Sequence, residues 1–148
     1  MTTNAKTLAE RCADKLWAED TAAQGLGISV QSVAEGFAEL TMTVKPNMAN
    51  GHNICHGGFI FTLADTAFAY ACNSQNQNAV AAGASIDYLR PGQLGDKLTA
   101  TAKALNQSKR SGLYDVTVRN QNDEILAQFR GRSARTKGQL VAEELNDD

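Results

Sequence analysis

The sequence has little of what exported, membrane-spanning or nucleic-acid-binding proteins need. Its net charge of −2 gives no electrostatic basis for attraction to nucleic acid or to an anionic membrane. Three cysteines, an odd number, in a chain that starts with polar residues and no apolar secretion signal predict reduced thiols and a cytoplasmic location. Internal repeats are also lacking, and 148 residues suit a single domain with a sizeable core.

Groups that hold metals or cofactors are scarce as well. The chain has two histidines, and His52, His56 and Asp65 lack the regular spacing of a metal-ligand set, so we expect no metal and no cofactor. Cys55 next to His56 invites comparison with a nucleophile and its base. Adjacent side chains rarely meet in the geometry that such a pair requires, so we do not assign this role.

The sequence does have a polar, glycine-bearing loop, residues 50–58, that runs directly into its most apolar continuous segment, Phe59–Cys72. Ala, Leu and Phe dominate this segment, which is too long for a typical strand and too short to span a bilayer. The segment therefore predicts a buried helix. Asp65 lies within it, where a carboxylate is unfavourable unless something pairs with it.

Two glycines stand at the head of the predicted helix. The first N–H groups of a helix carry partial positive charge, and Gly57 and Gly58 have no Cβ to screen them, so a ligand oxygen can approach. Backbone alone can form an oxyanion hole in this way. Asp65 lies two turns further on, roughly on the face of Gly58, Phe61 and Thr62, and this arrangement suggests acyl chemistry. Alternatively, the glycines only close a tight turn and Asp65 is a satisfied core or interface carboxylate.

The remaining pattern predicts helices and strands in separate stretches. An amphipathic helix is expected over 7–22, opened by a Thr7–Glu10 capping box, and strands over 28–33, 37–44, 79–89, 97–105, 113–120 and 124–135. This segregation indicates an α+β fold in which a sheet curls around the central helix and a second subunit covers the rest of it. We divide the chain into an N-terminal helix (1–24), a main domain (25–138) and an acidic C-terminal tail (139–148).

Four blocks of residues carry a resemblance to a known family. Asn50, His56-Gly57-Gly58 and Leu63-Ala64-Asp65 resemble the signature of the hot-dog fold acyl-CoA thioesterases. The run from Cys55 to Ser74 is similar to the phenylacetate-degradation members nearly residue for residue, and Ile86–Gly92 and Phe129–Ser133 are similar too. The likeness covers about residues 26–138. It implies a hot-dog fold, in which an antiparallel sheet wraps a long central helix, and homodimers that assemble into homotetramers.

The resemblance also implies roles for the residues around the helix start. The active site is expected at the dimer interface, where Asn50 positions the thioester or the water and the Gly57 N–H binds the thioester carbonyl. Asp65 of the opposite subunit is expected to act as general base or nucleophile. Thr66, beside it, is expected to orient water or the carboxylate.

Substrate contacts are expected on both sides of the helix start. His56 is expected to hold the loop with its ring and, with Gly58, to border the substrate. Aromatic side chains either line the acyl pocket or fill the core: Phe59, Phe61, Phe68 and Tyr88. Basic residues at strand ends or hairpins either pair with the phosphates of coenzyme A or are ordinary surface charges: Arg90, Lys109, Arg110, Arg130 and Arg132.

By this resemblance the chain is expected to hydrolyse aryl-acetyl thioesters, such as phenylacetyl-CoA and its ring-hydroxylated forms, in phenylacetate catabolism. A carboxylate would assist attack by water, and the thiolate leaves readily, so no metal is required. Two alternatives stay open. A hot-dog enoyl-CoA hydratase or dehydratase would need a histidine that does chemistry, and a non-catalytic acyl-CoA-binding module would tolerate loss of Asp65. The expected partners are acyl-CoA and further copies of the chain, with neither nucleic acid nor membrane.

Overall fold

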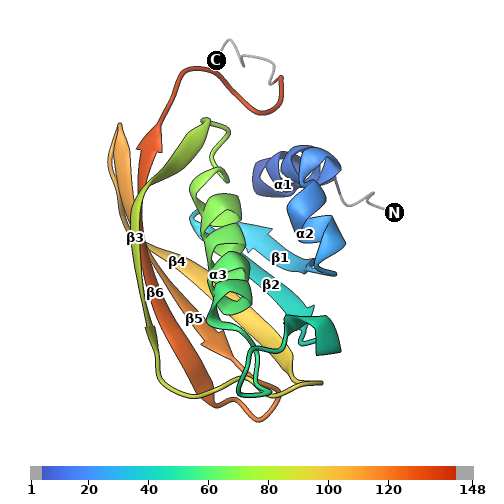
Figure 1. Ribbon diagram of the computed structural model, residues 1–148. Helices are drawn as coiled ribbons and strands as arrows, with labels where there is room; N and C mark the ends of the chain where they lie inside the picture. Colours follow the sequence, from blue (N-terminus) through green and yellow to red (C-terminus); the bar gives the residue numbers. More distant parts are fainter. Residues whose placement is uncertain (1–4, 143–148) are drawn as a thin grey trace.

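The computed structural model describes residues 5–142 and consists of one curled sheet with helices on its concave side (Figure 1). A short 3₁₀ turn, Pro46–Met48, precedes the central helix. The other elements, in chain order, are α1 Leu8–Glu19, α2 Thr21–Gly25, β1 Ser29–Ala34, β2 Phe37–Thr43, α3 Gly57–Cys72, β3 Ala79–Tyr88, β4 Lys97–Gln107, β5 Ser111–Arg119 and β6 Ile125–Arg135.

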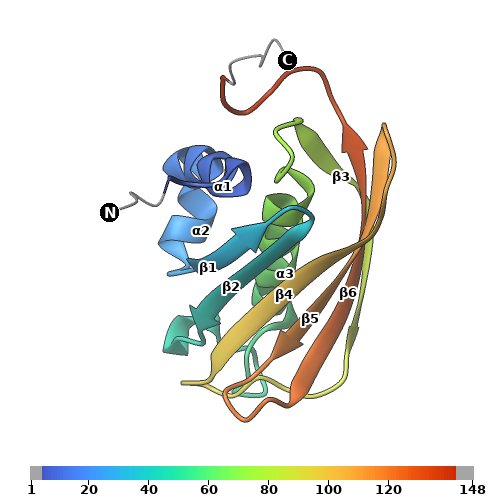
Figure 2. The same ribbon diagram turned by 180° about the vertical axis from the view of Figure 1, so that it is seen from behind.

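The sheet is antiparallel throughout and has the strand order β1-β2-β4-β5-β6-β3. β3 follows α3 in the chain but pairs with β6 at the far side, so β1 and β3 are the two edges. Seen from either side, the strands curl around α3 (Figures 1 and 2). The predicted α+β hot-dog fold is confirmed.

The core lies between α3 and the inner face of the sheet. The ring of Phe68 packs against Tyr114 on β5, with centroids 5.7 Å apart, and against Phe129 on β6 at 5.8 Å. Gly131 on β6 makes room for the Phe68 ring. A Cβ at this position would lie 2.8 Å from the ring, so a residue with a side chain would collide with it. Phe68 is therefore a core residue and does not line a substrate pocket.

One side of α3 stays uncovered by the chain's own sheet. Its partly exposed residues recur at helical spacing along this side, and they are Phe61, Thr62, Asp65, Thr66 and Ala69. The opposite sides are buried against β2, β4 and β5. The expectation that a second subunit covers this open face stays a prediction.

The N-terminal helix is shorter than predicted. Thr7 caps α1 in the expected capping box, with its hydroxyl bound to the Glu10 N–H and the Glu10 carboxylate bound to the Thr7 N–H. The predicted helix over 7–22 is wrong at its end, because Asp20 stops α1 and its carboxylate accepts from the Ala23 N–H to begin α2.

The first residues of the predicted C-terminal tail are held by Asn76, which is 2% exposed and lies just beyond α3. The Asn76 side-chain oxygen accepts from the backbone N–H groups of Leu140 and Val141 at 3.0 Å, and its amide donates to the Val141 carbonyl at 3.0 Å. Residues 143–148 of the predicted acidic tail lie outside the described residues. The division of the chain at residues 24 and 138 stays a prediction.

Candidate functional site

The loop before α3 is held by its asparagine. The Asn50 side-chain oxygen accepts from the N–H groups of His52 at 2.9 Å and Ile54 at 3.3 Å, and the Asn50 N–H donates to the Ile54 carbonyl at 2.8 Å. These bonds close a tight turn. The Asn50 amide nitrogen has no partner within residues 5–142, so it is the part of the side chain that can meet a ligand.

His56 caps the central helix. Its Nδ1 accepts a hydrogen bond from the Gly58 N–H at 2.9 Å, and its own N–H donates to the Met48 carbonyl at 2.8 Å. Nδ1 is engaged as the acceptor of this bond, so Nε2 is the ring nitrogen that is left to contact a ligand. The bond takes up the Gly58 N–H, which corrects the expectation that both glycine amides are open to a ligand oxygen.

The Gly57 N–H is the one remaining donor of this pair. It has no acceptor in the described part of the chain, while the Gly57 carbonyl accepts from the Tyr88 hydroxyl at 2.9 Å. A Cβ at Gly57 would lie 3.0 Å from the Tyr88 ring, which is closer than most real Cβ contacts. Glycine is therefore needed here for the close approach of Tyr88, and the approach of a ligand oxygen to the N–H stays a prediction.

Gly57 lines a hollow of about 440 Å³. It brings together four residues that the sequence assigned to the site: Asn50, Gly57, Tyr88 and Arg90. Five further residues line it and were not assigned to the site from the sequence: Ile54, Cys55, Ile60, Leu89 and Pro91. Leu89 and Pro91 could have been predicted from the sequence, because they follow Tyr88, which was already assigned to the site, and flank Arg90.

Asp65 lies on the open side of α3, away from this hollow. It makes no hydrogen bond or ion pair with any residue among 5–142, and burial raises the pKa of its carboxyl above the ordinary value. Thr66 beside it donates its hydroxyl to the Thr62 carbonyl at 2.7 Å, so only the oxygen lone pairs of Thr66 are left for a ligand. Asp65 follows Gly57 by eight residues, or about 12 Å along the axis. One chain cannot bring both to one reacting atom.

The aromatic residues assigned to the acyl pocket have protein contacts of their own. Phe61 packs edge-on against Phe129 with ring centroids 5.4 Å apart, which places much of it in the core. Phe59 meets the His56 ring edge-on at 6.1 Å and is half-buried. Of the four aromatic residues singled out from the sequence, Tyr88 is the one that borders the hollow.

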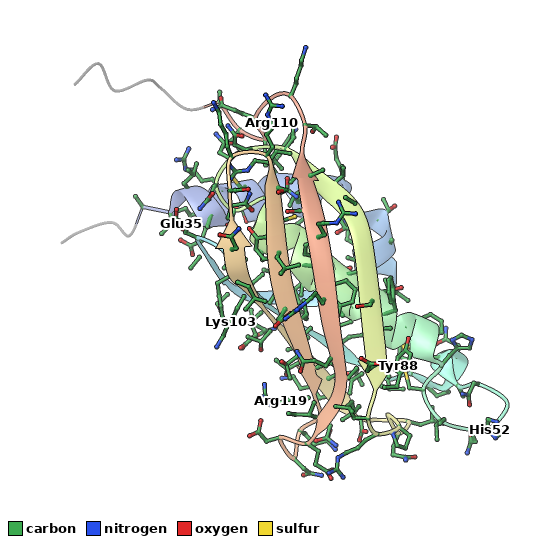
Figure 3. All side chains as sticks on the ribbon, turned by 90° about the vertical axis from the view of Figure 1, so that its left-hand side faces the viewer. Glu35, His52, Tyr88, Lys103, Arg110 and Arg119 are labelled. Carbon is green, nitrogen blue, oxygen red and sulfur yellow. The ribbon has the colours of Figure 1, made fainter. Side chains whose placement is uncertain are left out.

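The basic residues do not gather in one place, and Arg130 lies within β6 and not at a strand end or hairpin as expected. Lys109 and Arg110 form the β4–β5 turn, and in Figure 3 Arg110 and Tyr88 lie at opposite ends of the sheet. A single chain therefore does not bring this turn to the hollow. Arg90 borders the hollow and also pairs with Glu124 at 3.4 Å. Arg130 makes a two-point contact with the Asp115 carboxylate, at 2.7 and 3.0 Å.

Neither a metal site nor a membrane-spanning helix is found in the described part of the chain. No group of three or more His, Cys, Asp or Glu side chains within residues 5–142 is placed to hold a metal ion. None of the described helices has both the length and the apolar character needed to cross a membrane.

Comparison with known proteins shows the family of this chain. The thioesterase superfamily matches residues 52–127, and the chain belongs to that superfamily. It is 52% identical to the acyl-coenzyme A thioesterase PaaI of Escherichia coli over 131 residues, which are 88% of this chain and 94% of that protein. A putative esterase of Archaeoglobus fulgidus is 36% identical, with 84% of this chain and 80% of that protein covered.

Solved structures show the same fold. The structure of the Escherichia coli PaaI protein from the phenylacetic acid degradation operon matches with a TM-score of 0.88, covering 89% of this chain and 96% of that one. A Streptococcus mutans protein bound to acetyl-CoA matches with a TM-score of 0.73 at 29% identity, covering 76% and 90%. The resemblance inferred from the sequence blocks is confirmed.

Proposed function

We propose that this chain is an acyl-CoA thioesterase that hydrolyses aryl-acetyl thioesters, ring-hydroxylated ones included, in phenylacetate catabolism. The 52% identity to a PaaI acyl-CoA thioesterase over most of both chains supports the reaction. The operon of the Escherichia coli structure supports the substrate class, and the acetyl-CoA bound to the Streptococcus mutans structure supports coenzyme A as the carrier.

The observation that carries the chemistry is the Gly57 N–H at the start of a helix, which has no acceptor among residues 5–142 and belongs to a residue that lines a hollow. This amide would donate to the thioester carbonyl and stabilise the negative charge that develops on its oxygen, an effect worth about 10²–10³ in rate for one such donor. The Asn50 amide nitrogen would hold the thioester or the water at the same place. The capping role of His56 disfavours the hydratase alternative, because one of its two ring nitrogens, Nδ1, is engaged by the Gly58 N–H.

Asp65 would supply the other half of the reaction. A half-buried carboxylate with a raised pKa and no partner is suited to take a proton from water as that water attacks the carbonyl. A positioned general base contributes about 10²–10⁴ in rate. The tetrahedral intermediate would then collapse and expel coenzyme A as a thiolate.

These two halves would meet in a homodimer. Gly57 and Asp65 lie four residues on either side of Phe61, so a two-fold axis at the level of Phe61 would place each Gly57 opposite the partner's Asp65. The Phe129 that packs against Phe61 pairs with Ile86 on the edge strand β3, so the same axis would set two such edges side by side. Two uncovered helix faces and two open sheet edges would be buried together.

The same symmetry would bring the β4–β5 turn with Lys109 and Arg110, here called the basic turn, to the substrate. Because β3 strands paired about a two-fold axis run in opposite directions, Lys109 and Arg110 of one subunit would lie at the end of the sheet where the other subunit has its hollow. They would meet the phosphates of coenzyme A there, together with Arg90 of the other subunit. Assembly of dimers into a homotetramer and a cytoplasmic location complete the proposal.

Subunit mixing tests the shared site. Purified Asp65→Ala and Asn50→Ala proteins, each inactive, are mixed, allowed to exchange and assayed for release of free thiol from phenylacetyl-CoA. Random exchange makes half of the dimers mixed, each with one intact site, so about one quarter of wild-type activity should return. A mixture of Asp65→Ala with Asp65→Asn is the control and should stay inactive.

Two results would contradict the proposal in different ways. Exchange verified by mass spectrometry with no recovered activity would rule out a site shared by two subunits. A wild-type protein that releases no thiol from any aryl-acetyl or aliphatic CoA thioester would rule out the hydrolase itself and leave the binding module.

A further inference from the structure

One peptide unit at the start of α3 is held at both ends by side chains. The Gly57 carbonyl oxygen accepts from the Tyr88 hydroxyl at 2.9 Å, and the Gly58 N–H, which belongs to the same peptide plane, donates to His56 Nδ1 at 2.9 Å. The two side chains come from different parts of the chain. His56 directly precedes the helix, and Tyr88 ends the edge strand β3.

Tyr88 is itself fixed to the sheet. Its backbone pairs with Ala127 on β6, and the next residue, Leu89, donates its N–H to the Leu126 carbonyl at 2.8 Å. Ala127 and Leu126 are fully buried. The phenol therefore reaches Gly57 from a rigid part of the molecule, although half of the Tyr88 side chain is exposed to solvent.

The position that Tyr88 contacts needs such support. Glycine has the greatest backbone freedom of any residue, and here two glycines in succession form the first turn of a helix. An oxyanion donor acts by being held in place before the charge develops, so a loose Gly57 would weaken the effect. Hydrogen bonds at both ends of this peptide plane restrict its rotation, and with it the two torsions that flank the plane, ψ of Gly57 and φ of Gly58. The Gly57 N–H is attached to the Cα at one end of this plane.

We propose that Tyr88 is a positioning residue for the reaction: with His56 it fixes the Gly57–Gly58 peptide and thereby aims the free Gly57 N–H at the substrate carbonyl. This inference rests on the proposed function, because it needs an acyl group bound in front of Gly57. It differs from a role for Tyr88 as a ring that stacks on an aromatic acyl group. Only the hydroxyl of Tyr88 is needed for the positioning role, whereas only the ring is needed for stacking.

Tyr88→Phe separates the two roles, since it keeps the ring and removes the hydroxyl. We expect kcat for phenylacetyl-CoA to fall about three- to tenfold, the equivalent of one lost hydrogen bond, with KM changed by less than about twofold. Tyr70→Phe is the matched control. It also removes a phenol hydrogen bond made by α3, to Asp20 at 3.2 Å, but far from the Gly57 amide, and kcat should stay at the wild-type value.

A second measurement tests directly whether the Gly57–Gly58 peptide group is restrained. Hydrogen exchange followed by mass spectrometry on the peptide spanning residues 55–62 should be faster in Tyr88→Phe than in wild type and unchanged in Tyr70→Phe. Equal exchange in wild type and Tyr88→Phe would contradict the inference that the Tyr88 hydroxyl restrains the Gly57–Gly58 peptide group. Faster exchange with unchanged kcat would overturn the positioning role.

The combined results distinguish this inference from the proposed function. Wild-type kcat in Tyr88→Phe together with a large loss in Tyr88→Ala would identify a ring contact only and would also overturn the positioning role, while hydrolysis by the wild type would leave the thioesterase standing. Absence of thiol release from the wild type would instead contradict the hydrolase and, with it, the positioning role.

Discussion

The hydroxyl of Tyr70 on α3 donates a hydrogen bond to Oδ2 of Asp20 at 3.2 Å, and this contact ties the central helix to the N-terminal helices. The other oxygen of the same carboxylate, Oδ1, accepts from the Ala23 N–H at 3.2 Å and begins α2. Tyr70 is 2% exposed, so its hydroxyl has no ready access to water. One carboxylate therefore supports both the start of α2 and the contact between α3 and the N-terminal region.

Asp20→Ala should lower the free energy of unfolding by about 1–3 kcal/mol, because it removes a helix cap and leaves a buried phenol without an acceptor. Adding Tyr70→Phe should recover part of this loss, since the orphaned hydroxyl is then gone. Asp14→Ala is the control. Asp14 pairs with Lys6 at the surface, where an ion pair contributes little. Denaturant unfolding gives the free energy of unfolding of Asp20→Ala, of the double variant and of Asp14→Ala. A loss in Asp20→Ala no larger than the loss in Asp14→Ala would contradict the prediction.

Asp65→Asn should lower kcat/KM for phenylacetyl-CoA by about two orders of magnitude or more, because the amide cannot accept a proton from water. In the wild type, activity should rise with pH as the carboxyl ionises. Burial raises the pKa of Asp65 above 3.8, so this acid limb should lie above the range of an ordinary aspartate. A pH–rate profile over the range in which the protein stays folded checks both. Near-wild-type turnover in Asp65→Asn would exclude the catalytic role.

The same substitution should stabilise the fold at neutral pH. A raised native pKa means that the ionised carboxylate is less favourable in the folded chain than in the unfolded chain, so stability falls as pH rises from the unfolded pKa through the native pKa. Below the unfolded pKa both states are protonated, and Asp65→Asn should gain nothing. Melting temperatures of the two proteins should diverge as pH rises across this range, with the Asp65→Asn protein the higher; parallel curves would contradict the burial of the charge.

Much of the fold could be predicted from local pattern. The alternation in residues 37–44 predicts β2, and the apolar run of residues 59–72 predicts α3. The observed ends of both elements differ from the predicted ends by no more than two residues. The break at Asp20 was missed because helical periodicity runs on through Ala23, and periodicity does not reveal that one carboxylate stops a helix and caps the next.

The site was harder to predict than the fold, because its key contacts join residues far apart in the chain. Gly57 and Asp65 were assigned to the site from a local motif within a single helix, and this assignment stays a prediction. The bond from Tyr88 to Gly57 spans 31 residues, and no sequence period encodes it. The cap by His56 was missed for another reason: histidine is not among the residues that usually cap a helix, so the local pattern offered no reason to remove Gly58 from the donors.

The basic turn offers a test of how coenzyme A is held. Replacing Lys109 and Arg110 together by Gln should raise KM for phenylacetyl-CoA, while KM for a thioester of a short thiol without phosphates should stay unchanged. Added salt should raise KM for the full-length substrate in the wild type more than in the double variant. Lys103→Gln is the matched control, since Lys103 is exposed on β4 away from the turn (Figure 3). Equal effects on both substrates would contradict a phosphate contact.

The acyl group is the last prediction. Aryl-acetyl thioesters should exceed aliphatic ones in kcat/KM by roughly three- to tenfold, because stacking of two rings adds about 0.5–1.5 kcal/mol beyond the burial of their area. Phe61 is largely occupied by Phe129, which leaves Tyr88 at the hollow and Phe59 at the helix start as the rings able to meet the substrate. A preference carried by so few rings should be selective without being exclusive.

The measurement is kcat/KM for phenylacetyl, hydroxyphenylacetyl, benzoyl, acetyl and hexanoyl thioesters of coenzyme A in one buffer. Benzoyl-CoA tests the length of the pocket, since its ring is one carbon closer to the carbonyl and could not reach the same contacts while the carbonyl stays at Gly57. Hexanoyl-CoA offers comparable apolar area without a ring, so it isolates the stacking contribution. If hexanoyl-CoA exceeds phenylacetyl-CoA by about tenfold, the aryl-acetyl assignment is wrong, because area burial and not ring contact would then set the preference.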